Sequence, residues 1–112
     1  MLQKKHRLSK KQFDSIMSQG KAIHSPFFTF VYSLNKAESM GLVSVAPKKI
    51  SKTAVERNKI RRRIYGSIER VIGNTPIPIQ GIFLAKAGVI KADYKSLDEG
   101  VRQIFVKLGF LK

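Results

Sequence analysis

Apolar residues recur along the chain at two spacings, one helical and one alternating, and they predict the order helix, strand, strand, helix, strand, helix. The first helix begins at Ser9, whose hydroxyl forms a capping-box pair with the side chain of Gln12, and it ends at Gly20. Its apolar face carries Phe13, Ile16 and Met17.

Three segments have the pattern of strands. Phe27–Leu34 is rich in aromatic and β-branched residues that alternate between two faces. The polar loop Asn35–Ser39 predicts a hairpin connection to a second strand, Gly41–Ala46, which Pro47 ends. Ile79–Ala87 is short and largely apolar, which predicts a third strand buried on both faces or nearly so.

Two longer helices follow the second and third strands. The first of them starts with a capping-box pair, Thr53 and Glu56, and runs to Gly73. The last helix is capped at Asp93 or Ser96. Each helix has an apolar stripe that predicts packing on the sheet. The stripes are Ile60, Ile64, Ile68 and Val71 in one helix, and Leu97, Val101, Ile104, Phe105 and Leu108 in the other.

Length and charge narrow the class of protein. A chain of 112 residues predicts a single domain, residues 1–112. Lys and Arg number 22 against 7 Asp and Glu, and the resulting net charge of +15 is eased when a polyanion binds, so we expect a nucleic acid as partner. We expect no membrane partner, since no apolar run is long enough to cross a bilayer. The chain has no cysteine, which excludes a disulfide framework and is typical of a cytoplasmic protein.

The positive charge is concentrated in residues 48–63, which hold eight of the 22 Lys and Arg. A helical wheel groups five residues into one polar band beside the apolar stripe: Arg57, Asn58, Arg61, Arg62 and Tyr65. Lys59 and Arg63 fall on the opposite flank. Arginine forks suit RNA phosphates, so the segment indicates an RNA-binding surface. From charge alone, the alternative is a solvated helix face without a specific partner.

The order of residues in this segment is more specific than its charge. Residues 52–64 read Lys-Thr-Ala-Val-Glu-Arg-Asn-Lys-Ile-Arg-Arg-Arg-Ile, which resembles the signature of the bacterial ribonuclease P protein family, a basic helix built around Arg-Asn-Arg after an Ala-Val pair. Further residues match that family's spacings: Arg7, Leu8, Phe13, Gly20, Lys21, Phe28, Gly41–Val45, Lys48 and Lys49. The resemblance therefore covers nearly the whole chain.

Three residues depart from the family pattern. Lys59 replaces the second arginine of the motif, Met17 stands where an aromatic residue often flanks a cleft, and Tyr65 occupies a position that is usually basic. These departures concern the roles of single residues and leave the resemblance as a whole unchanged.

The resemblance implies an α/β fold, described as an α+β sandwich, with a mixed central sheet. It also implies a left-handed strand–helix–strand connection through the basic helix. Physical reasoning alone would predict the right-handed form. The residues implied in RNA binding are Lys48, Lys49, Lys52, Arg57, Asn58, Lys59, Arg61, Arg62, Arg63 and Tyr65. Those implied in a cleft for the precursor-tRNA leader are Phe13, Met17, Thr29 and Val31. Periodicity alone would instead place Phe13 in the core.

The function implied is that of the protein subunit of ribonuclease P, an endonuclease that removes the 5′ leader of precursor tRNA. In that family the RNA subunit carries the chemistry and the Mg²⁺ ions, so we expect no catalytic residue in the protein. The expected partners are the catalytic RNA and precursor tRNA, and no protein partner is required. A ribosomal or other structural RNA-binding protein shares the size and charge and stays open as the alternative, and a small histone-like DNA-binding protein shares the charge.

Overall fold

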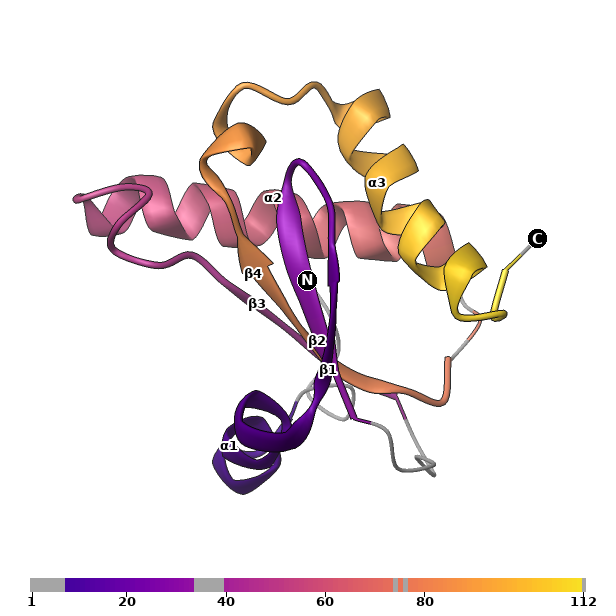
Figure 1. Cartoon of the computed structure of the whole chain (residues 1–112). Coiled ribbons are helices and arrows are strands. Elements are labelled where there is room, and N and C mark those ends of the chain that lie inside the picture. The colour runs from indigo at the N-terminus through magenta and orange to yellow at the C-terminus, as the bar shows by residue number, and fades with distance from the viewer. Residues whose placement is uncertain (1–7, 34–39, 74, 76, 112) are drawn as a thin grey trace.

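A four-stranded sheet lies between two helical layers in the computed structural model, which describes residues 8–33, 40–73, 75 and 77–111 (Figure 1). In chain order the elements are α1 (Lys10–Gln19), β1 (Lys21–His24), β2 (Phe28–Tyr32), β3 (Gly41–Val45), α2 (Ala54–Ile72), β4 (Gln80–Ala85), the short 3₁₀ helix η2 (Ala87–Ile90) and α3 (Tyr94–Lys107). Helix α1 covers one face of the sheet, and α2 and α3 cover the other.

The strands lie in the order β1-β2-β4-β3, which confirms the predicted mixed sheet. β2 pairs antiparallel with both β1 and β4, whereas β3 pairs parallel with β4. The predicted hairpin between β2 and β3 is wrong, because β4 lies between these two strands. The loop Asn35–Ser39 of that prediction lies outside the described residues. The left-handed connection through α2 stays a prediction.

Strand β1 was not predicted from the sequence. It is an edge strand of four residues, and only Ile23 among them is strongly apolar. It forms a hairpin with β2, in which the Ser25 N–H donates to the Phe28 carbonyl at 2.9 Å. An exposed edge strand needs little apolar pattern, so its sequence does not stand out from a loop.

Two apolar cores lie on opposite faces of the sheet. The larger one lies under α2 and α3, where the rings of Phe30 and Phe83 are 4.5 Å apart and those of Phe28 and Phe83 are 5.0 Å apart. The smaller one lies under α1 and contains Ile16, Val31 and Ile82. Since each strand alternates its side chains, the same strands supply both cores.

The predicted helix starts are confirmed. The Ser9 hydroxyl accepts from the Gln12 N–H at 3.2 Å, and the Gln12 side chain accepts from the Ser9 N–H at 2.9 Å, a complete capping box. Thr53 caps α2 by accepting from the Glu56 N–H at 3.3 Å, but the return bond from the Glu56 side chain that the predicted capping box needs is not formed. Of the two residues proposed to cap α3, Asp93 is the cap, and it accepts from the Ser96 N–H at 2.7 Å.

Gly81 has no room for a side chain, because an added Cβ would lie 2.3 Å from Cζ of the buried Phe30 ring. We predict that Gly81→Ala lowers the free energy of unfolding by roughly 1–3 kcal/mol through overpacking. Urea unfolding checks this. Gly66→Ala is the matched control, since the Cβ there meets only the end of the Arg70 side chain at 3.3 Å. Equal effects of the two substitutions would contradict the prediction.

Candidate nucleic-acid interface

The N-terminal half of α2 and the loop before it form a basic surface. Most of the residues predicted to bind RNA are exposed there: Lys48, Lys49, Lys52, Asn58, Lys59, Arg61 and Arg62. The structure thus brings seven of the predicted residues together on one helix and its approach. Their amphipathic placement follows from the stripe of isoleucines that fixes the opposite side of α2 on the sheet.

Local hydrogen bonds orient three of the polar side chains on this surface. The Arg57 guanidinium is half-buried and donates to the Ser51 carbonyl at 3.0 Å, which ties the helix to the preceding loop. The Asn58 side chain accepts a hydrogen bond from Arg61, and Arg62 Nε lies 3.4 Å from the Asn58 carbonyl. Asn58 therefore holds two arginines close together at the surface.

Arg63 has a structural role that the sequence did not reveal. Its guanidinium donates to the carbonyl of Val89 at 3.1 Å and also to those of Ile90 and Ala92. These carbonyls lie in and after η2, so Arg63 holds the segment between β4 and α3 against α2. The prediction that it lies on the opposite flank of the helix from Arg61 is confirmed, but its donors are engaged within the protein.

Tyr65 was predicted in the exposed polar band, and that placement is wrong. The residue is 7% exposed, and its hydroxyl accepts a hydrogen bond from the Ser44 N–H at 3.0 Å. Ser44 belongs to β3, the strand at the edge of the sheet. Tyr65 therefore satisfies an edge-strand donor and joins α2 to β3. An amphipathic side chain at the margin of an apolar stripe can lie on either side of it, and here burial of the ring decides.

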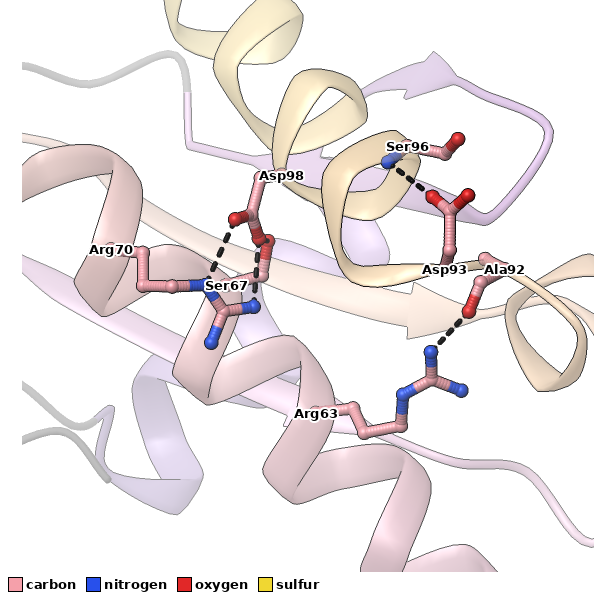
Figure 2. Close-up of polar contacts among 7 residues, drawn as sticks. All are labelled: Arg63, Ser67, Arg70, Ala92, Asp93, Ser96 and Asp98. Carbon is pink, nitrogen blue, oxygen red and sulfur yellow. Dashed lines mark hydrogen bonds and ion pairs between the residues drawn. The ribbon is translucent and has the colours of Figure 1, made fainter.

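A polar cluster joins α2 to α3 (Figure 2). Arg70 donates from Nε and Nη2 to the two carboxylate oxygens of Asp98, both at 2.8 Å, and the Ser67 hydroxyl donates to Asp98 at 2.6 Å. These bonds, that from Arg70 above all, hold the pKa of the Asp98 carboxyl below its ordinary value, and the pKa of Arg70 is raised in turn. The Tyr94 ring lies 5.3 Å from the Arg63 guanidinium and 5.1 Å from that of Arg70. This cluster fixes one helix on the other.

The residues predicted for a leader cleft gather on the α1 face of the sheet. Met17 is exposed, and Phe13 and Thr29 are half-buried. Val31 is only 9% exposed and packs with Ile16 and Ile82, so it lies beneath the surface rather than on it. The structure therefore places Phe13 between the two alternatives, packed on the small core and partly open to solvent.

Three residues on this face were missed by sequence reasoning. Across the sheet, Thr29 pairs with both His24 and Leu84, and Leu84 pairs with Val45, so these four residues form one row. His24 Nδ1 lies 3.1 Å from Thr29 Oγ1. The row could not be read from the sequence, because it depends on strand β1 and on the insertion of β4 beside β2.

None of the described helices is both long and apolar enough to cross a membrane. Within the same part of the chain, no group of three or more His, Asp and Glu side chains is placed to hold a metal ion.

Comparison with known proteins places this geometry in a family. The family model described as Ribonuclease P matches residues 2–109. The ribonuclease P protein component of a Nitratiruptor species is 32% identical over 100 residues, which cover 89% of this chain and 88% of that one. The component from Microcystis aeruginosa is 28% identical over 113 residues, with 95% and 92% covered. The solved ribonuclease P protein of Staphylococcus aureus shares the fold, with a TM-score of 0.75 at 18% identity and 96% and 98% of the two chains covered.

The Arg70–Asp98 pair predicts a pH dependence of stability. Because the pKa of Asp98 is lower in the folded chain, its contribution is present above the unfolded pKa of about 3.9 and is lost as pH falls through the folded value. We expect Asp98→Asn to destabilise the protein near neutral pH and to match the unaltered protein under strongly acidic conditions. Urea unfolding across pH measures the gap, with Glu99→Gln as control. A gap that does not change with pH would contradict this role.

Proposed function

The chain belongs to the ribonuclease P protein family, and we propose that it binds the catalytic RNA subunit through α2 and the 5′ leader of precursor tRNA through the α1 face of its sheet. It is a protein component of a ribonuclease complex. The observation that carries the RNA-binding part of the proposal is the basic surface of α2 and its preceding loop. A cytoplasmic location is part of the same proposal.

The basic surface suits phosphate binding for two reasons. Arg61 and Arg62 are exposed and lie about one turn from Asn58, which accepts from Arg61 through its side chain and from Arg62 through its carbonyl. Such ordering reduces the entropy lost when a guanidinium binds phosphate in a forked geometry. The lysines at positions 48, 49, 52 and 59 add point charges around these two arginines.

The α1 face of the sheet suits a single strand of variable sequence. Phe13 and Met17 on α1 offer apolar surface beside the row His24, Thr29, Leu84 and Val45. Stacking on an aromatic ring tolerates any base, whereas base-edge recognition would restrict the leader sequence. Binding by stacking therefore suits a leader whose sequence differs from one precursor tRNA to the next.

We assign the cleavage chemistry to the RNA subunit and its Mg²⁺ ions, as the family resemblance implies. Two acidic residues of this chain have structural roles instead: Asp93 caps α3, and Asp98 binds Arg70. The protein's part is to lower the electrostatic repulsion between two RNAs and to hold the leader in place.

Salt dependence tests the basic surface. We predict that Arg61→Ala with Arg62→Ala leaves the fold intact, weakens RNA binding and lowers the slope of log affinity against log salt by roughly 1.4–1.8, as expected for two lost phosphate contacts. Affinity for the catalytic RNA at several salt concentrations measures the slope. Arg63→Ala is the control, because its contacts are internal. It should lower the thermal midpoint and leave the slope unchanged. A slope unaltered in the double variant would refute the assignment.

Leader binding gives a separate prediction. Phe13→Ala should weaken the holoenzyme's binding of precursor tRNA by about 1–3 kcal/mol and leave mature tRNA unaffected, since only the precursor carries the leader. The comparison is made with leaders of increasing length. Ile16→Ala is the control, because Ile16 is buried in the small core. Its replacement should reduce stability without discriminating between the two tRNAs. Equal losses for precursor and mature tRNA on replacing Phe13 would return that residue to the core.

A further inference from the structure

The outer edge of β1 presents backbone groups that the sheet does not use. The Ser33 N–H donates to the Gln80 carbonyl at 2.9 Å, which assigns the odd-numbered residues of β2 to the β4 ladder and the even-numbered ones to β1. In the β1–β2 register, the even-numbered residues of β2 face the odd-numbered residues of β1. The N–H and C=O groups of Ala22 and His24 therefore point outward, and both residues are exposed.

A groove of about 760 Å³ lies between this hairpin and α3. Its apolar lining includes Ile23 and Phe27 from the hairpin and Ile104 from α3. The Phe27 ring lies directly against the backbone of α3, where a Cβ on Gly100 would be 3.0 Å from Cδ2 of the ring. The groove therefore joins a strand edge that can form hydrogen bonds to an apolar wall of defined shape.

The charges around the groove are mainly positive. Lys95 and Lys107 of α3 line it, and Lys21 is exposed at the start of β1. The one carboxylate in the lining, that of Glu99, accepts a hydrogen bond from the Gln103 amide at 2.7 Å. A partner segment that carries negative charge would be electrostatically complementary to this rim.

We propose that the groove between β1 and α3 binds an extended acidic peptide, which adds to the sheet as a further strand along β1. The peptide backbone would bond to the outward groups of Ala22 and His24. Alternate side chains would then contact the apolar wall at Ile23 and Ile104, and acidic side chains would lie near the lysines. A groove between an edge strand and a helix is the geometry of strand addition. This site goes beyond the proposed function and does not depend on it.

The same groove is less suited to single-stranded RNA. Binding of a strand of bases relies on aromatic rings whose faces are open for stacking. Phe27 lines the groove but is half-buried with its ring against Gly100, and the imidazole of His24, which also lines it, lies beside Thr29 on the α1 face of the sheet. The outward backbone groups at β1 instead match the spacing of another peptide strand.

The test selects binders from a phage-displayed library of random seven-residue peptides on the full-length protein without RNA. We expect the recovered peptides to be rich in acidic and β-branched residues. Binding of synthetic copies should slow hydrogen exchange at the Ala22 and His24 amides about tenfold or more, because those donors become bonded. Amide exchange followed by NMR measures this directly.

Two kinds of variant locate the binding. Ala22→Pro removes one outward N–H and no ladder bond, and it should weaken the peptides about tenfold, as expected for loss of a backbone hydrogen bond and of strand geometry. Lys95→Glu with Lys107→Glu should weaken them through charge while leaving the backbone unaltered. Lys91→Glu is the matched control, since Lys91 is exposed and follows η2 away from the groove lining. Circular dichroism confirms that each variant is folded.

Three results would overturn the proposal. One is a selection whose peptides bind all the variants equally. Another is binding that leaves exchange at Ala22 and His24 unchanged. The third is a single-stranded oligouridine that displaces the peptides and protects the same two amides at lower concentration, which would assign the groove to nucleic acid. Binding of the catalytic RNA should be the same in Ala22→Pro as in the unaltered protein, so failure here is distinguishable from failure of the proposed function.

Discussion

The buried apolar side of α2 keeps the helix on the sheet, although the basic residues on its other side repel one another. Four isoleucines one turn apart, Ile60, Ile64, Ile68 and Ile72, are at most 6% exposed and fix the helix on the sheet. The arginines and lysines at the other side repel one another and would favour a looser arrangement. Apolar burial does not depend on charge, so it opposes this repulsion and holds the helix on the sheet. The orientation of every charge on the surface follows from that stripe.

Arginines on this helix divide into two groups with different partners. Arg61 and Arg62 are exposed beside Asn58. Arg57 donates instead to the Ser51 carbonyl, Arg63 to the carbonyls around η2, and Arg70 to the carboxylate of Asp98. Helical spacing correctly separated Arg63 from Arg61 and Arg62, but it misplaced Tyr65, which is buried. It could not predict which flank is occupied from within, because the carbonyls that bind Arg63 are contributed by a distant segment of the chain. A basic run therefore overstates the number of residues that face a ligand.

Helix positions and caps were predictable, since local spacing and side-chain hydrogen bonds decide them. Strand neighbours were not. The predicted hairpin between β2 and β3 was wrong because β4 is inserted between them. β1 was not predicted because an exposed edge strand needs little apolar pattern. The burial of Tyr65 likewise depends on a residue distant in sequence, because its hydroxyl accepts a hydrogen bond from Ser44. That Phe13, Met17, Thr29 and Val31 bind the leader stays a prediction, and the row beside them could be found only from the register of three strand pairs.

The insertion of β4 also sets an order of events when the chain is made. β2, β3 and the whole of α2 leave the ribosome before β4 does, so the strand that pairs with both β2 and β3 is missing at that stage. Until then the basic helix has no completed sheet to rest on, and two strand edges stay unpaired. Pairing of segments far apart in sequence is slow, and unpaired edges favour association between chains. Late arrival of a single six-residue strand thus delays completion of the sheet until after the whole of α2 has been made.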